Sequence, residues 1–292
     1  MGSFSFANEQ HADVNLKAYS PMFDDCLDYV AINGNGDDQM LKYRIIPLKV
    51  GEFQTTEKSN FTYMKNQGQK IKAPIIMYLI QNGEKNFLVD VGCGDEAWCK
   101  QYHHPIVQTE DMKPLNALKK VGMTPDDIDA IILTHLHWDH CFNLDLFPKS
   151  KVYVQKKEIM SALFPLKTEV VFYEGFEMGL KAKWIEALPN FIVLNGDAVI
   201  AEGVEVKLLP GHTRGFQGVI VETEKGKYLI ASDTIPLLEN LEDKLFGMIR
   251  PSGIHVDLEQ YYKTLGFIQN SGYHVLPGHD ERAFEHKVYP IA

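Results

Sequence analysis

The feature that most constrains this 292-residue chain is the run Thr134-His135-Leu136-His137-Trp138-Asp139-His140, which places four potential metal ligands within six positions. The residues directly before it, 130–133, are apolar and partly β-branched, a pattern typical of a buried strand. The polar cluster therefore begins where a strand ends, and such loops carry chemistry on a rigid base. Neutral imidazoles and a carboxylate are ligands that zinc prefers. We therefore predict a metal site here, since a plain polar turn rarely brings three histidines so close together.

The spacing H-x-H-x-D-H at the end of a strand resembles the signature of the metallo-β-lactamase superfamily. That family carries its other ligands at later strand ends, and this chain supplies them in order. His212 lies in a Gly-His-Thr segment, Asp233 follows a strand-like run, and His279 comes near the C-terminus. The resemblance extends from about Tyr43 to His279. It implies one metal ion held by His135, His137 and His212, a second held by Asp139, His140 and His279, and Asp233 bridging the two.

The resemblance implies an αβ/βα sandwich of two mixed sheets with outer helices, whereas periodicity alone indicates only α/β or α+β. We expect a single domain over 1–292, with 1–40 as an N-terminal extension and 164–200 as a variable insertion over the site. The polar stretch 52–72 is expected to be a long loop. The apolar patterns predict strands at 43–50, 75–80, 86–92, 130–133, 152–154, 204–209, 218–223, 227–230 and 273–276, and helices at 114–121, 156–163 and 257–269.

Four residues outside the ligand set are candidates for supporting roles. Asp90 begins a run that resembles the family's D-x-G motif, which implies that it orients a metal-binding histidine without being a ligand. An Asp that simply starts a turn is almost as good an explanation. Phe61, Met64 and His255 are candidates for the substrate pocket, because such pockets combine apolar walls with a few polar groups. Ordinary packing is the alternative for each of them.

The ligand set implies a hydrolase in which a hydroxide that bridges two metal ions attacks a carbonyl carbon. Asp139 and Asp233 are the predicted catalytic residues, Asp233 as the bridge and Asp139 as a group that orients the hydroxide and carries a proton. Zinc is the first choice of metal, although iron or manganese would suit the same ligands. The oxygen ligand Asp233 stands where the common dinuclear class B β-lactamases have Cys, which disfavours a β-lactam substrate.

Within the superfamily, the chain is most similar to the N-acyl homoserine lactonases. The similarity lies in the run 135–141, in the Gly-His-Thr segment and in 251–254. It implies that the substrate is a lactone of the acyl homoserine lactone kind, or a related ester, and that the activity is quorum quenching. One departure is Pro236, which stands three residues after Asp233 where studied lactonases place a Tyr. A glyoxalase II-like thioesterase and a phosphotriesterase-like hydrolase are alternatives, and a non-catalytic metal-bearing binding protein is a weaker one.

Composition limits the partners of this protein. The net charge of −10 argues against a nucleic acid, because phosphate binding favours a basic face. No apolar stretch is long enough to span a membrane, and the N-terminus does not resemble a signal peptide. Cys26, Cys93, Cys99 and Cys141 form no C-x-x-C pair and fit free thiols in the cytoplasm. Exposed aromatic loops leave a homodimer open, and the acyl-chain preference and the metal in the cell are not determined by the sequence.

Overall fold

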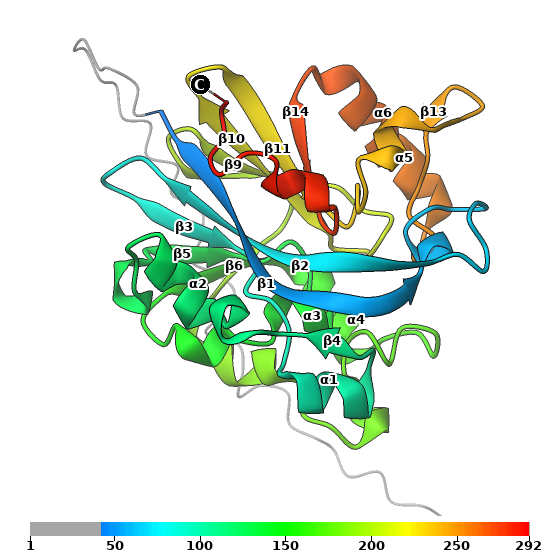
Figure 1. The fold of residues 1–292 in the computed structure, drawn as a ribbon, viewed down its shortest axis with the longest axis horizontal. Helices are drawn as coiled ribbons and strands as arrows, with labels where there is room; N and C mark the ends of the chain where they lie inside the picture. The colour runs from blue at the N-terminus through cyan, green and yellow to red at the C-terminus, as the bar shows by residue number, and fades with distance from the viewer. Residues whose placement is uncertain (1–41, 292) are drawn as a thin grey trace, which may run out of the picture. The chain divides into compact units, whose positions relative to one another are not determined.

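A computed structural model of this chain describes residues 42–291. The extension predicted over 1–40, and Cys26 within it, lie outside the described residues. The described residues form two large sheets that pack face to face, with helices on the two outer faces (Figure 1). This layering confirms the predicted sandwich of mixed sheets. That the whole chain forms a single domain stays a prediction.

The first sheet has seven strands in the order β4-β1-β2-β3-β5-β6-β7. Strands β3, β5, β6 and β7 run parallel to one another, so their carboxyl ends share one edge. The turn 82–85 joins β2 to β3 as an antiparallel hairpin, as predicted. The strands are β1 (Arg44–Glu57), β2 (Lys70–Gln81), β3 (Asn86–Val89), β4 (Ile106–Val107), β5 (Ala130–Ile132), β6 (Lys151–Gln155) and β7 (Phe191–Leu194).

The second sheet has five strands in the order β14-β11-β10-β9-β8. Strand β14 is parallel to β11, while β10 is antiparallel to both β9 and β11. The ends of β9, β11 and β14 therefore lie at one edge. The strands are β8 (Ala198–Ala201), β9 (Val204–Leu208), β10 (Gln217–Thr223), β11 (Gly226–Ser232) and β14 (His274–Pro277), and a separate two-stranded sheet consists of β12 (Lys244–Leu245) and β13 (Met248–Ile249).

The helices are short, apart from the last one. Helix α6 begins after Asp257, whose side chain accepts a hydrogen bond from the backbone of Gln260, as the sequence predicted for a helix cap. The α-helices are α1 (Glu96–Tyr102), α2 (Pro114–Lys120), α3 (Trp138–Cys141), α4 (Lys156–Leu163), α5 (Glu239–Glu242) and α6 (Leu258–Ser271). The 3-10 helices span Lys58–Asn60, Glu110–Met112, Pro125–Asp127, Leu144–Leu146, Phe176–Met178, Lys183–Asn190 and Glu281–Phe284.

Three clusters of buried apolar residues correspond to the three contacts between layers. One lies between the two sheets and includes Val89, Ile132 and Val219. A second lies between the seven-stranded sheet and its outer helices, and a third lies between the five-stranded sheet and α6. Each sheet is therefore apolar on both faces, which explains why several of its strands read as continuous apolar runs. The rigid layers fix the edge where the polar loops meet.

Two segments differ from their predictions. The long loop expected over 52–72 is shorter, because β1 continues to Glu57 and β2 begins at Lys70. The pairing of β1 with β2 shifts register after Lys49 and again after Phe53. Such bulges bend a strand and break the alternation from which strands are predicted. The expected insertion over 164–200 is also too long, since 191–194 and 198–201 are edge strands of the two sheets.

Candidate metal centre

All seven predicted ligands follow strand ends at one edge of the sandwich, five on loops and two, Asp139 and His140, in the short helix α3. His135, His137, Asp139 and His140 follow β5 of the first sheet. The other three follow β9, β11 and β14 of the second sheet, at His212, Asp233 and His279. Because the carboxyl ends of these strands meet, residues up to about 144 positions apart in sequence converge. All seven residues are buried, each with at most 8% of its surface exposed.

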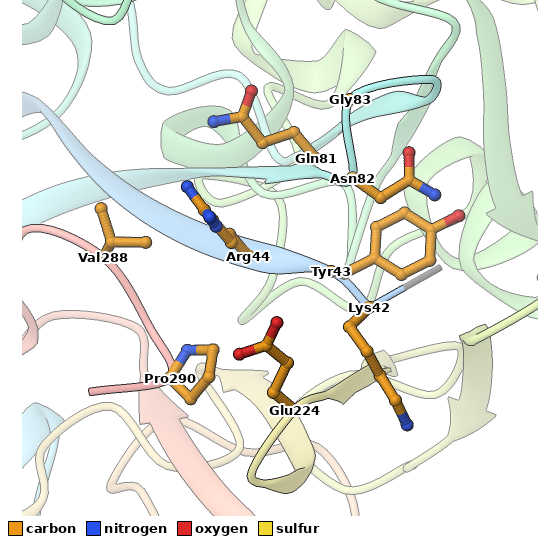
Figure 2. Close-up of a pocket in the computed structure, with 9 residues that line it drawn as sticks. All are labelled: Lys42, Tyr43, Arg44, Gln81, Asn82, Gly83, Glu224, Val288 and Pro290. Carbon is orange, nitrogen blue, oxygen red and sulfur yellow. The ribbon is translucent and has the colours of Figure 1, made fainter. Parts of the chain in front are cut away.

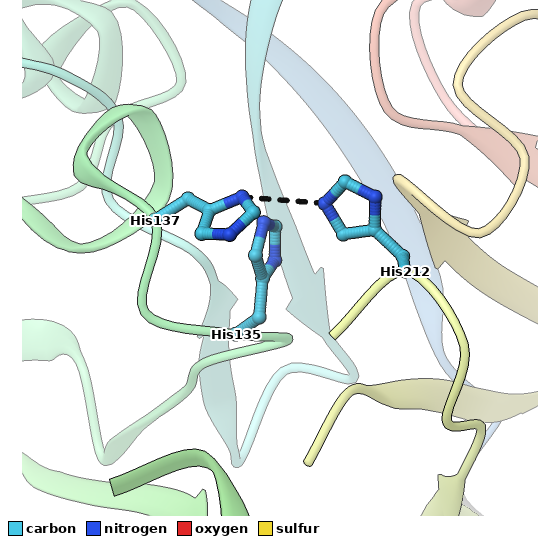
Figure 3. Close-up of side chains that lie close together, drawn as sticks. All are labelled: His135, His137 and His212. Carbon is cyan, nitrogen blue, oxygen red and sulfur yellow. Dashed lines mark hydrogen bonds between the residues drawn. The ribbon is translucent and has the colours of Figure 1, made fainter. Parts of the chain in front are cut away.

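The seven side chains form three overlapping groups in which the potential ligand atoms lie within 4.8 Å of one another. Figure 3 shows one of these groups, in which His137 and His212 point toward each other from facing loops and His135 lies between them. Within this group, Nδ1 of His137 lies 3.3 Å from Nε2 of His212. The groups are His135, His137 and His212; His135, His140 and Asp233; and Asp139, His140 and His279.

Asp233 stands between the two histidine sets. Its Oδ2 lies 3.4 Å from Nε2 of His212, in the first predicted set. Its Oδ1 lies 3.4 Å from Nε2 of His140 and 3.0 Å from Nε2 of His279, in the second set. The two oxygens of one carboxylate thus face different histidines, which is the arrangement a bridging ligand requires.

Hydrogen bonds to the outer ring nitrogens fix the orientation of three histidines. Each acceptor is a carboxylate or a backbone carbonyl, which cannot donate, so each Nδ1 carries the hydrogen and each Nε2 presents a lone pair to the cluster. The Nδ1-to-oxygen distances are 2.8 Å for His140 and Asp90, 2.8 Å for His212 and Ile254, and 2.8 Å for His279 and Pro74.

The buried atoms that face the centre fit a divalent cation. Among the described residues, Nε2 of His135, Nε2 of His140 and Oδ1 of Asp233 are buried without a hydrogen-bond partner. An unpartnered buried polar atom costs free energy, and several converging lone pairs repel one another in the absence of a cation. Imidazole nitrogens with carboxylate oxygens are a suitable donor set for zinc, and also for iron or manganese.

The electrostatics of the cluster separate the two histidine sets. Burial lowers the pKa of His135, His137 and His212, and neighbouring histidines lower the pKa of His135 and His137 further. Burial acts on His140 in the same direction, but the carboxylates of Asp139, Asp233 and Asp90 outweigh it and raise its pKa. His279 likewise has a raised pKa, because Asp233 outweighs burial. The first three histidines are therefore neutral ligands, while the carboxylates concentrate at the second set.

Asp90 connects the strand ends β3 and β5 to the ligands. Its carboxylate accepts hydrogen bonds from the backbone N–H and the hydroxyl of Thr134, both at 2.8 Å, and from His140. The Thr134 oxygen lies 2.9 Å from Nδ1 of His135, so it can accept the hydrogen of that ring. Asp90 has a φ of 60°, a left-handed conformation that non-glycine residues seldom adopt. Its predicted role in orienting a ligand stays a prediction, but the required contact is present.

A pocket of about 210 Å³ opens beside the first histidine set. His255 lines this pocket, and its predicted role in substrate binding stays a prediction. Its Nδ1 lies 3.0 Å from the carbonyl oxygen of Ser252 and therefore carries the hydrogen. No residue of the described chain is a hydrogen-bond partner of its Nε2. The lining residues are His137, Thr168, Glu169, Phe172, His212, Gly253, Ile254 and His255.

The other two predicted pocket residues differ in their positions. Phe61 is buried, and its ring centroid lies 5.3 Å from that of His279, so it packs against a ligand. Met64 is 69% exposed and does not line the pocket, which gives no support to its predicted role. Pro236 is buried, and its carbonyl accepts a hydrogen bond from the backbone of His279. This backbone hydrogen bond joins the segment after Asp233 to the loop that carries the last ligand.

Two buried acids were not predicted from the sequence: Glu158 bonds directly to the ligand loops, and Glu174 is linked to them through His103. Glu158 accepts four hydrogen bonds, among them one from the backbone of Leu136. Glu174 accepts hydrogen bonds from His103 at 2.9 Å and Trp98 at 2.8 Å. The ring of His103 in turn stacks on Trp138, with ring centroids 4.1 Å apart. The sequence offers one indication of a buried Glu158. It lies four residues before Ala162, on the apolar side of the predicted helix.

A second pocket contains none of the predicted ligands. Figure 2 shows this pocket of about 610 Å³, between the start of β1, the β2–β3 turn and the β10–β11 turn. Lys42 at its rim pairs with Glu222.

None of the helices described in the structure combines the length and apolar character needed to cross a bilayer.

Comparison with known proteins places these features in a family context. Residues 74–279 match the model of the metallo-beta-lactamase superfamily. The N-acyl homoserine lactonase AiiA of Bacillus thuringiensis subsp. kurstaki is 30% identical over 188 residues, which cover 61% of this chain and 70% of AiiA.

Two solved structures show the same fold. A variant of B. thuringiensis AiiA with N-decanoyl-L-homoserine at its active site is 25% identical, with a TM-score of 0.69 over 86% of this chain and 99% of that chain. AidC, described as a dizinc quorum-quenching lactonase, was solved with its product N-hexanoyl-L-homoserine. It is 18% identical, with a TM-score of 0.63 over 84% of this chain and 90% of AidC.

Proposed function

Because the chain belongs to the metallo-beta-lactamase superfamily, we propose that it is a dinuclear metal-dependent hydrolase that opens an N-acyl homoserine lactone or a related lactone. The observation that carries this proposal is the convergence of seven buried ligand side chains, three of which hold a buried polar atom without a hydrogen-bond partner. Homologues that are N-acyl homoserine lactonases support the substrate class. The dizinc lactonase of the same fold supports zinc as the metal.

His135, His137 and His212 would hold one ion, Asp139, His140 and His279 the other, and Asp233 would contact both. Two bound divalent ions supply Lewis acidity to a carbonyl oxygen and lower the pKa of water enough for attack at neutral pH. The protein side chains exclude bulk water from the centre, since all seven are buried. Asp139 is the most exposed ligand at 8%, so its free carboxylate oxygen is suited to hold a proton for the leaving alkoxide.

His255 is the substrate contact that the geometry favours. With the hydrogen on Nδ1, the neutral ring offers Nε2 as a hydrogen-bond acceptor in the pocket beside His137 and His212. The amide N–H of an acyl homoserine lactone is a donor that such an acceptor would bind. Phe172 supplies an apolar wall of the same pocket. We therefore propose that the pocket holds the lactone near the first metal position, with His255 binding its amide.

The role of the tyrosine that other lactonases place after the bridging Asp is not taken by Tyr261. Its hydroxyl lies 3.0 Å from the carbonyl oxygen of Asp233 and 2.9 Å from that of Thr234, and it accepts from the backbone N–H of Ser252. These partners occupy the hydroxyl in the protein interior. Negative charge that develops on the lactone oxygen would therefore be stabilised by the metal positions and not by a tyrosine.

The test is ring opening of acyl homoserine lactones by zinc-loaded protein, followed as acid release. Simple γ- and δ-lactones, a thioester and an activated phosphotriester are run in parallel. We expect acyl homoserine lactones to be hydrolysed with the highest kcat/KM, and Asp233→Ala and Asp139→Asn to abolish turnover. Metal-dependent cleavage of only the thioester or the phosphotriester would contradict the proposed lactone substrate, but it would still support a metal-dependent hydrolase. If the protein binds two metal ions but hydrolyses none of these substrates, the proposal that it is an enzyme is wrong.

A further inference from the structure

A buried carboxylate next to the first histidine set takes no part in the proposed chemistry. Glu158 lies in the first turn of α4, and its exposure is 0%. Four donors converge on its two oxygens, each within 3.1 Å. Oε1 accepts from the backbone N–H of Leu136 and the hydroxyl of Tyr173, and Oε2 accepts from the hydroxyl of Thr213 and the backbone N–H of Gly215.

These donors come from both loops that carry the first histidine set. Leu136 lies between His135 and His137, and Thr213 directly follows His212. Tyr173 adds a third element, because its ring centroid lies 4.9 Å from that of His137. One side chain therefore holds together two loops that are about 75 residues apart in sequence.

The arrangement of donors favours the ionised form of Glu158. Both oxygens act as acceptors, and the two backbone N–H groups can only donate. Burial alone would favour the neutral acid and raises the pKa of this group, but four donors stabilise the charged form. Among the residues that the structure describes, no Lys, Arg or His forms an ion pair with Glu158. A buried charge without a partner is costly, so a positive charge close by would stabilise it.

We propose that Glu158 is a positioning residue that aligns His135, His137 and His212 and supplies the negative charge that selects a divalent cation there. This inference rests on the proposed metal centre. The three histidines are neutral ligands, so the nearby carboxylate raises the affinity of this position for a cation through charge as well as geometry. The second position, with Asp139 as a direct ligand, has less need of such a group.

The test compares zinc binding by Glu158→Gln with that of the unaltered protein, by equilibrium dialysis with metal analysis at buffered free zinc. We expect one of two zinc ions to bind roughly 10–100-fold more weakly, while the other keeps its affinity. The variant His137→Ala lacks a direct ligand of the first metal position. Its zinc binding therefore shows what is expected of a protein in which that position no longer binds metal. The cobalt-substituted Glu158→Gln protein should lose the same absorption bands as His137→Ala. The control Glu110→Gln alters a 79% exposed acid and should bind two ions like the unaltered protein.

A result in which Glu158→Gln binds both ions with unchanged affinity overturns the inference. If this variant does not fold, as judged by circular dichroism, Tyr173→Phe and Thr213→Val replace it, because each removes one donor and keeps the carboxylate. Each should weaken the same ion by a smaller factor, and no weakening in either also overturns the inference. Failure of the unaltered protein to bind any divalent ion would instead overturn the proposed function.

Discussion

At the scale of the single residue, hydrogen bonds outside the centre determine which atoms face it. The donors on His140, His212 and His279 are used by a carboxylate and two backbone carbonyls, so the remaining nitrogens point inward as lone pairs. Asp90 is the only one of these partners that is a side chain. Its replacement therefore tests the arrangement without disturbing the backbone.

Asp90→Asn is expected to weaken zinc binding by roughly 10–100-fold. The three partners of Asp90 are all donors: the Thr134 N–H, the Thr134 hydroxyl and the His140 ring. The side-chain amide of Asn would place its own N–H opposite one of them, and that hydrogen bond would be lost. The measurement is a competition titration with a chromophoric zinc chelator. Asp126→Asn, at a 71% exposed carboxylate, is the matched control and should leave the affinity unchanged. Equal affinities in the two variants would show that Asp90 only begins a turn.

His255→Phe is expected to lower kcat/KM for an acyl homoserine lactone by about 10-fold, which corresponds to about 1.4 kcal/mol of lost transition-state binding. The ring size is kept, but the acceptor Nε2 is lost. The zinc content should stay at the level of the unaltered protein, because His255 belongs to none of the ligand groups. Tyr63→Phe keeps the aromatic edge that packs on His255 and is the control. An unchanged kcat/KM for His255→Phe would remove this residue from the substrate contacts.

At the scale of the element, the sequence predicted what is local and missed what depends on distant partners. The helix expected at 156–163 is α4 (Lys156–Leu163), and the ligand loops follow predicted strands. The seven ligands could be identified because each lies in a short recognisable run. Glu158 could not, because its donors come from three separate segments that only the fold brings together. The end of β1 was missed because bulges break its apolar alternation.

The segment 169–174 contacts the ligand loops directly through Phe172 and Tyr173, and Glu174 adds an indirect link through His103. Its carboxylate binds His103, whose ring stacks on Trp138 between two ligands. We expect Glu174→Gln to lower the free energy of unfolding by about 1–3 kcal/mol, because two buried donors lose a charged acceptor. Urea unfolding followed by circular dichroism measures this difference.

Tryptophan fluorescence of the same variant reports whether the surroundings of Trp98, which donates to Glu174, or of Trp138, which stacks on His103, change with it. The matched control is Glu177→Gln, a 55% exposed acid paired with Lys167, which should change the free energy by less than about 1 kcal/mol. If Glu174→Gln behaves like this control in both measurements, the contact through His103 does not hold the segment in place.

At the scale of the whole molecule, the metal centre joins the two sheets. Its ligands follow strands of both sheets, so bound ions would crosslink the two halves of the sandwich. The protein has a net charge of −10, and two divalent cations at this centre would offset four of these negative charges. Metal binding and folding are therefore expected to be coupled, since a ligand that binds only the folded state stabilises it.

Removal of metal is therefore expected to lower the melting temperature by roughly 10 °C. A ligand at about 1,000 times its Kd contributes about 4 kcal/mol, and each kcal/mol shifts the melting temperature of a chain of this size by about 2–4 °C. The measurement is calorimetric unfolding of zinc-loaded and chelator-treated protein, followed by re-addition of zinc. His137→Ala should show a smaller shift, because only one position of the pair remains complete. Equal melting temperatures with and without two bound zinc ions would mean that the metal centre does not crosslink the sheets. The buried lone pairs of the ligands would then be tolerated in the folded protein at no cost to its stability.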